Sequence, residues 1–228
     1  ASSVDAGLPH GAAPLTEAQL GMWFAQRMDP GNPIFNIGHC THIEGPLDIP
    51  ALQRAVDAAL READALAMRV VEHGGTAWQA LDEALRPRLE IVDLRADPSP
   101  LETAQHRMRA DMHRPVDPTR QAMAAHVLYR LGEDHAVWYQ RLHHVAADGY
   151  GMGLIDARDA RLYAREIGAS DDAGEPLAAY AQALEEDAAY ADAAVRFLKA
   201  VTKGWIYARD NPEEAATIVY DIASNAEA

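Results

Sequence analysis

The stretch His143-His144-Val-Ala-Ala-Asp148-Gly149 is the densest polar cluster in the sequence. It follows the apolar, aromatic run Ala136-Val-Trp-Tyr139, which is typical of a buried strand, and it leads into helical patterning over residues 148–167. Adjacent side chains of a strand point to opposite faces, so one histidine can face a cavity while the other makes local contacts. The stretch therefore predicts a strand-to-helix junction that presents one histidine to a site.

The residue types of this stretch fit proton transfer. Histidine titrates near neutrality, so a cavity-facing imidazole can take a proton from an incoming nucleophile. Asp148 can cap the following helix or pair with a buried arginine, and Gly149 can allow a sharp turn or a close backbone approach. A purely structural role for the paired histidines stays open as an alternative. Because the sequence contains neither CxxC nor HExxH, no metal site is expected.

The rest of the chain predicts an α/β (α+β) fold, a mixed sheet with helices packed on it. Helices are expected over residues 17–26 with Thr16 as N-cap, after the cap Asp48, and over 100–112, 148–167 and 177–194. Strands are expected over residues 34–44, 66–72 and 89–92, around Trp78, and as a hairpin of 123–131 with 135–142. Residues 1–13 read as a flexible lead-in.

Composition excludes several classes of function. The chain has 228 residues, 49% of them hydrophobic, enough for one domain with its own core. A net charge of −15 would repel a phosphate backbone and no basic patch offsets it, so no nucleic-acid binding is expected. No apolar run reaches the length of a membrane span. The single cysteine Cys40 and the lack of a signal-like N-terminus predict a cytoplasmic protein.

The pattern HHxxxDG at residues 143–149 resembles the signature of nonribosomal peptide synthetase condensation domains, which they share with chloramphenicol acetyltransferase-like acyltransferases. Further segments resemble motifs of that family in the same order: Leu15-Thr-Glu-Ala-Gln19-Leu-Gly-Met-Trp23, Asn36-Ile37, Ile43-Glu-Gly-Pro-Leu47, Ala65-Leu-Ala-Met-Arg69-Val70 and Pro115-Val-Asp117. The resemblance covers residues 14–194 and implies a chloramphenicol acetyltransferase-like N-terminal lobe.

The resemblance implies a reaction and its partners. Such domains join a carrier-bound acyl or peptidyl thioester to the amine of a carrier-bound aminoacyl group. The partners implied are peptidyl or acyl carrier proteins, other synthetase domains and a second lobe. No intrinsic cofactor is implied, and the phosphopantetheine arms of the carriers hold the substrates.

The resemblance also assigns roles to residues. It places His144 at the reaction centre, as a general base or as the group that positions the amine and stabilises the tetrahedral intermediate. His143 would be structural, and Asp148 would form an ion pair for which Arg69 is the candidate partner. Gly149 would keep the channel beside His144 open.

Several features depart from the family pattern. The resemblance covers the first of two lobes, so activity would need a second lobe from another copy or another polypeptide. Ala67 and Val70 stand where the family has arginine and phenylalanine. Residues 195–228, which hold both lysines of the chain, weakly resemble the C-terminal helices of periplasmic substrate-binding proteins. A helical tail that covers the end of the lobe is the favoured interpretation of these residues.

Other functions of the same fold remain open at this stage. One is an acyltransferase that uses coenzyme A thioesters, and another is a non-catalytic docking half-domain that binds carrier proteins. Epimerisation domains share the motif as well. The continuation Gly149-Tyr-Gly151 favours a siderophore-type synthetase.

Overall fold

A computed structural model describes residues 7–172, 174, 176 and 177 of the chain. They all belong to the first of two compact units, Ala1–Ala179 and Tyr180–Ala228. The expected helix over residues 177–194, apart from Leu177, and the expected tail over 195–228 therefore lie outside the described residues, as do residues 1–6 of the expected lead-in.

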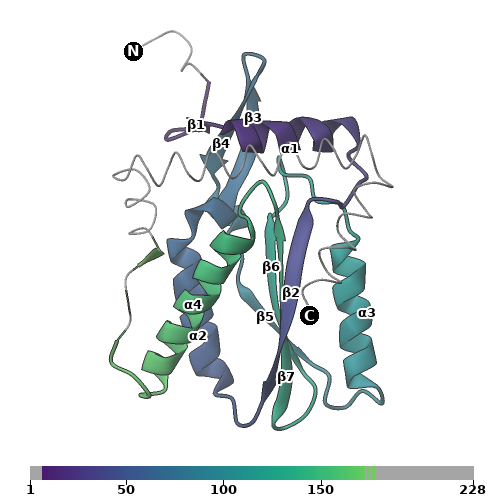
Figure 1. Ribbon diagram of the computed structural model, residues 1–228, viewed down its shortest axis with the longest axis vertical. Coiled ribbons are helices and arrows are strands. Elements are labelled where there is room, and N and C mark those ends of the chain that lie inside the picture. Colours follow the sequence, from purple (N-terminus) through teal and green to yellow (C-terminus); the bar gives the residue numbers. More distant parts are fainter. Residues whose placement is uncertain (1–6, 173, 175, 178–228) are drawn as a thin grey trace, which may run out of the picture. The chain divides into compact units, whose positions relative to one another are not determined.

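A mixed sheet of four strands forms the centre of this unit (Figure 1). In spatial order its strands are β2 (Asn36–Glu44), β7 (His135–His143), β6 (Ala124–Arg130) and β5 (Leu89–Asp93). The pairs β2–β7 and β6–β7 are antiparallel, whereas β5 runs parallel to β6. The predicted mixed sheet and the predicted hairpin are thus confirmed.

Helices cover both faces of the sheet. In Figure 1, α2 (Ile49–Glu62) and α4 (Gly149–Glu166) lie against one face and α3 (Pro100–Met112) against the other. Side chains of β6 and β7 alternate between two apolar clusters, as the period of a strand requires. The first cluster includes Leu128, Trp138 and Leu142 with Val56 and Leu60 of α2. The second includes Val127, Tyr129 and Val137 with Ala104 and Met108 of α3.

Local capping signals set where the helices begin. Helix α1 (Glu17–Met28) starts after Thr16, whose side chain forms the predicted cap in a reciprocal capping box with Gln19. Asp48 caps α2 by accepting a hydrogen bond of 2.9 Å from the backbone nitrogen of Ala51. The helix over Pro100–Met112 has the predicted bounds. None of the helices in the described part of the chain is long and apolar enough to cross a membrane.

A second, smaller sheet has the order β1-β4-β3, and its Val70 and Ala77 share an apolar cluster with Trp23 of α1. Its strands are β1 (Ala13–Pro14), β4 (Thr76–Leu81) and β3 (Met68–His73), and short 3₁₀ helices occupy Asp64–Ala67 and Glu83–Leu85. The expected strand over residues 66–72 therefore begins with a turn instead. The end of the expected lead-in is also ordered, because Ala13 pairs with Gln79. A strand of two residues is too short to show the alternation of apolar and polar residues, so the sequence does not mark it.

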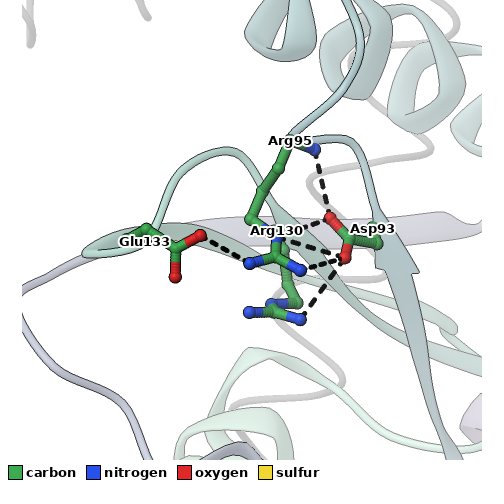
Figure 2. A network of polar contacts seen from close by, with 4 residues as sticks. All are labelled: Asp93, Arg95, Arg130 and Glu133. Carbon is green, nitrogen blue, oxygen red and sulfur yellow. Dashed lines mark hydrogen bonds and ion pairs between the residues drawn. The ribbon is translucent and has the colours of Figure 1, made fainter.

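Ion pairs tie the end of β5 to the β6–β7 hairpin (Figure 2). Asp93 lies 2.7 Å from Arg95 and 3.4 Å from Arg130, and Arg95 also lies 2.6 Å from Glu133. The hydrogen bonds from Arg95 hold the pKa of Asp93 below its usual range. These side chains are at the surface, so their main effect is to fix the loop geometry, with little net gain in stability.

Candidate active site

The predicted strand-to-helix junction lies where β7 ends and the chain turns toward α4. Three backbone hydrogen bonds hold this turn. The nitrogen of His143 donates to Met123 O at 2.7 Å, that of His144 donates to Phe35 O at 2.8 Å, and that of Ala146 donates to His143 O at 2.8 Å. The turn is therefore fixed to the entry of β2 and to the start of β6.

His143 is a buried histidine with local partners. Its side chain is 1% exposed. Its Nδ1 accepts a hydrogen bond of 3.2 Å from the backbone nitrogen of Val145, and its Nε2 lies 3.4 Å from Oε1 of Gln26. Burial, followed by the charge of Arg141, lowers the pKa of His143 to about 4. The ring is therefore neutral at physiological pH.

His144 differs from its neighbour in the state of its ring. The residue is half-buried, and its Nδ1 is shielded from solvent without a hydrogen-bond partner in the described part of the chain. Its backbone is held by Phe35, so the ring is attached to a fixed point. A substrate cannot reach this shielded Nδ1 from solvent, so Nε2 is the candidate ring nitrogen for binding a substrate N–H or accepting its proton. Of the two histidines, His144 is the one that is not fully buried.

Asp148 and Arg69 do not form the ion pair that was expected between them. Oδ1 of Asp148 accepts a hydrogen bond of 2.8 Å from the backbone nitrogen of Gly151 and caps α4. Nε of Arg69 lies 3.2 Å from Oδ2 of Asp82. Arg69 pairs with Ala80 in the β3–β4 ladder, so its side chain lies on the face shared by Asp82, two residues further on. The register of the β3–β4 pair therefore brings Arg69 next to Asp82.

Gly149 does not serve as a sharp turn. It begins α4, it has no positive φ, and a Cβ built on it would meet no atom within 4 Å among the described residues. Apart from its chain neighbours and the backbone of its own helix, no described residue lies close to that position, so the close backbone approach expected at Gly149 is not seen in this part of the chain. The open space beside it is compatible with its other expected role, which is to leave room next to His144.

A small cavity joins the motif turn to α1 and to the small sheet. Gln19 of α1, Arg69 of β3 and the turn residues Val145 and Ala146 are among the residues that line it. Arg69 thus lies near the motif even though its ion pair is with Asp82. The described residues contain no group of three or more side chains arranged to hold a metal ion.

Two of the contacts that shape the turn come from residues that the sequence analysis missed. Gln26 reaches His143 from the end of α1, and Phe35 holds the backbone of His144 from the start of β2. Gln26 carried a usable signal, because it is a polar residue on the same helical face as Gln19 and Trp23. Phe35 acts through its carbonyl group, which no sequence pattern marks.

Comparisons with known proteins bear on the family of this chain. A sequence model of a family described as the condensation domain matches residues 10–194. The dimodular nonribosomal peptide synthase of Bacillus subtilis is 36% identical over 176 residues, which are 77% of this chain and 7% of that protein. Enterobactin synthase component F of Escherichia coli is 35% identical over 176 residues, 76% of this chain and 14% of that protein.

Solved structures give the same result for the fold. A variant of the starter condensation domain of rhizomide synthetase RzmA, in complex with C8-CoA and Leu-SNAC, superposes with a TM-score of 0.68 at 30% identity. The match covers 77% of this chain and 40% of the solved chain. The chain thus spans a small part of each of these synthetases and less than half of the solved domain.

Proposed function

Because the chain belongs to the condensation-domain family, we propose that it forms the lobe that carries the reaction-centre histidine of a nonribosomal peptide synthetase condensation site. The reaction joins an acyl or peptidyl thioester on one carrier protein to the amine of an aminoacyl thioester on another. The similarity to enterobactin synthase component F supports the proposal that this lobe belongs to a siderophore-type synthetase.

The observation that carries this proposal is the state of His144. Its backbone is fixed by Phe35, and the residue is only half-buried, whereas the neighbouring His143 is fully buried. In the reaction the amine nitrogen forms a bond to the thioester carbon, and the carbon–sulfur bond breaks. His144 takes or directs the proton that the amine loses, and the departing thiolate receives a proton. Holding the amine in line contributes to the rate as well.

Asp148 and His143 support this reaction without touching the substrates. Asp148 fixes the start of α4 through Gly151, and His143 fixes the turn through Val145. Gly149 leaves space beside the turn, where a substrate on a phosphopantetheine arm would pass. We propose that a second lobe, in the same or another polypeptide, closes this side and that the carrier proteins dock on the completed domain.

The test is formation of a carrier-bound amide. The full chain, alone and combined with a second-lobe polypeptide from a related synthetase, is mixed with one carrier bearing an acyl group and another bearing an amino acid. Mass spectrometry of the acceptor carrier detects the product. We expect His144→Ala to remove the product, and His106→Ala, which changes an exposed histidine of α3, to leave it unchanged. Normal turnover by His144→Ala would contradict the role of His144.

A second candidate is a donor bound to coenzyme A. It is favoured by the solved starter condensation domain, which was captured with C8-CoA. The same assay with octanoyl-CoA in place of the acyl carrier separates the two donors. Product from octanoyl-CoA, lost in His144→Ala, would assign the coenzyme A donor. Carrier binding that is unaffected by His144→Ala, with no product from either donor, would instead indicate a docking domain without catalysis.

A further inference from the structure

One face of α1 lies against the turn that carries His144. Gln19, Trp23 and Gln26 are spaced by four and three residues, so they share one face of the helix. Trp23 is 4% exposed and packs in the same apolar cluster as Val145 of the turn. The two glutamines flank this tryptophan along the helix, and each contacts a residue next to His144 in sequence.

The side-chain amide of Gln26 has a defined orientation. Its Nε2 lies 3.2 Å from Asp29 O, 3.4 Å from Pro30 O and 3.1 Å from Asn32 O. Carbonyl oxygens only accept hydrogen bonds, so the NH₂ group must face them and Oε1 must face His143. Because Oε1 is also only an acceptor, Nε2 of His143 must carry the proton. Nδ1 of His143 is then left with a lone pair.

Both backbone polar groups of Val145 are held by side chains. Its nitrogen donates to the bare Nδ1 of His143 at 3.2 Å, and its carbonyl oxygen accepts from Nε2 of Gln19 at 3.0 Å. The amide of Gln19 is itself oriented, because its Oε1 accepts from the backbone nitrogen of Thr16 at 2.9 Å. A chain of hydrogen bonds therefore runs from α1 to each side of His144.

We propose that Gln19 and Gln26 are positioning residues for His144, and that Gln26 acts by holding His143 as the neutral ring protonated on Nε2. The role given to His144 rests on the proposed function, whereas the hydrogen-bond relay from α1 to Val145 does not. A reacting group displaced by about 1 Å can lose on the order of a hundredfold in rate, so such a relay has a direct use in catalysis.

The first experiment needs no variant. Nitrogen-15 NMR of the full chain, labelled at histidine, distinguishes a protonated ring nitrogen from a bare one. We expect the His143 ring in wild-type protein at pH 7 to be protonated on Nε2 and bare on Nδ1, with the Val145 amide proton coupled to that bare nitrogen. A His143 ring protonated on Nδ1 would overturn the proposal.

The second experiment breaks each half of the relay in turn. Gln26→Met and Gln19→Met remove the amide and keep a side chain of similar length. Gln53→Met is the matched control. The side-chain amide of Gln53 donates a hydrogen bond of 3.4 Å to Leu89 O, and neither residue belongs to the turn that carries His144. We expect amide hydrogen exchange at Val145 to be about fivefold to tenfold faster in the first two variants, since each releases part of its hydrogen bonding. Unchanged exchange in both would overturn the proposal.

Turnover gives the last readout and separates this proposal from the proposed function. We expect kcat to fall about tenfold or more in Gln26→Met and Gln19→Met relative to Gln53→Met, at a temperature at which all three variants remain folded. If wild type shows the relay by NMR but no turnover on any substrate, the proposed function fails while the relay stands. If kcat is unchanged although the Val145 amide is released, the positioning role is overturned.

Discussion

The carboxylate of Asp148 accepts a hydrogen bond of 2.8 Å from the backbone nitrogen of Gly151, which makes the aspartate of the HHxxxDG motif the N-cap of α4. The contact joins the turn that carries His144 to the helix behind it. A capping role depends on a side-chain oxygen in the right place, whereas an ion pair depends on the charge. The two roles therefore respond differently to substitution.

The first prediction follows from this difference. Asp148→Ala should lower the free energy of unfolding by about 1 kcal/mol, because an orphan helix N–H loses its acceptor. Asp148→Asn should lose only a few tenths of that, because asparagine caps about as well as aspartate. Urea denaturation of both variants measures this. A loss in Asp148→Asn as large as in Asp148→Ala would show that the charge, and not the cap, is what matters.

The second prediction concerns the partner of Arg69. A double-mutant cycle between Arg69 and Asp82 should give a coupling of less than about 1 kcal/mol but above zero, since both side chains are about one-third exposed. The cycle between Arg69 and Asp148 should give none. Both cycles are measured with alanine variants in the same urea series. Coupling confined to the Arg69–Asp148 cycle would restore the ion pair that the family resemblance implies.

Features that depend on a few neighbouring residues could be predicted from the sequence. Local signals predicted the caps at Thr16 and Asp48. These signals act within one turn of chain, so they can be read without the fold. The HHxxxDG pattern likewise predicted that His144 lies at the end of a strand, and β7 ends at the preceding residue.

Contacts across the fold were beyond that reach. Strand β1 is only Ala13–Pro14 and pairs with β4, so neither alternation nor length marks it. The contact between Gln26 and His143 joins residues 117 positions apart in the sequence, so it depends on how α1 packs against the rest of the fold. The Arg69–Asp82 contact was within reach in principle, because a hairpin of β3 and β4 places them on one face.

The third prediction uses two glycines with opposite surroundings. A Cβ on Gly38 of β2 would lie 2.6 Å from Gln140 O and 2.9 Å from Sδ of Met112. Gly38→Ala should therefore cost about 1–3 kcal/mol, because the main chain of β7 cannot move aside easily. Gly149→Ala should cost nothing and can gain up to about 1 kcal/mol, since alanine favours the helix. Thermal unfolding of both variants gives the comparison.

Gly149→Ala also tests the proposed channel. If a substrate arm passes beside this residue, the variant should keep its melting temperature and lose turnover with carrier-bound substrates. A variant with full turnover would show that no substrate comes within reach of a methyl group at this position. Gly38→Ala cannot serve this purpose, because its effect on the sheet would lower turnover indirectly.

The last prediction concerns how stability varies with pH. Burial lowers the pKa of His126 and of His143 to about 4. Histidine in an unfolded chain titrates near about 6.5, so between these values the unfolded state binds protons that the folded state does not. The contribution of these histidines to the free energy of unfolding therefore rises with pH across this window and is flat above it. Each histidine can contribute about 3 kcal/mol by this route.

Asp159 of α4 acts in the opposite direction. It is fully buried, neither carboxylate oxygen has a partner among the residues described, and burial raises its pKa to about 9. The folded state then holds a proton that the unfolded state releases near about 3.9, so Asp159 lowers stability as pH rises toward 9. Two histidines outweigh one aspartate below pH 6.5, and above it only the aspartate acts. Stability should therefore be greatest near pH 6.5.

Urea denaturation between pH 5 and 9 measures this profile, and two variants assign its limbs. His126→Met should flatten the acid limb, because only His143 is then left to offset the opposite slope from Asp159. Asp159→Asn should flatten the alkaline limb and raise stability at pH 8. A wild-type profile that climbs steadily to pH 9, or an alkaline limb that persists in Asp159→Asn, would contradict the assignment.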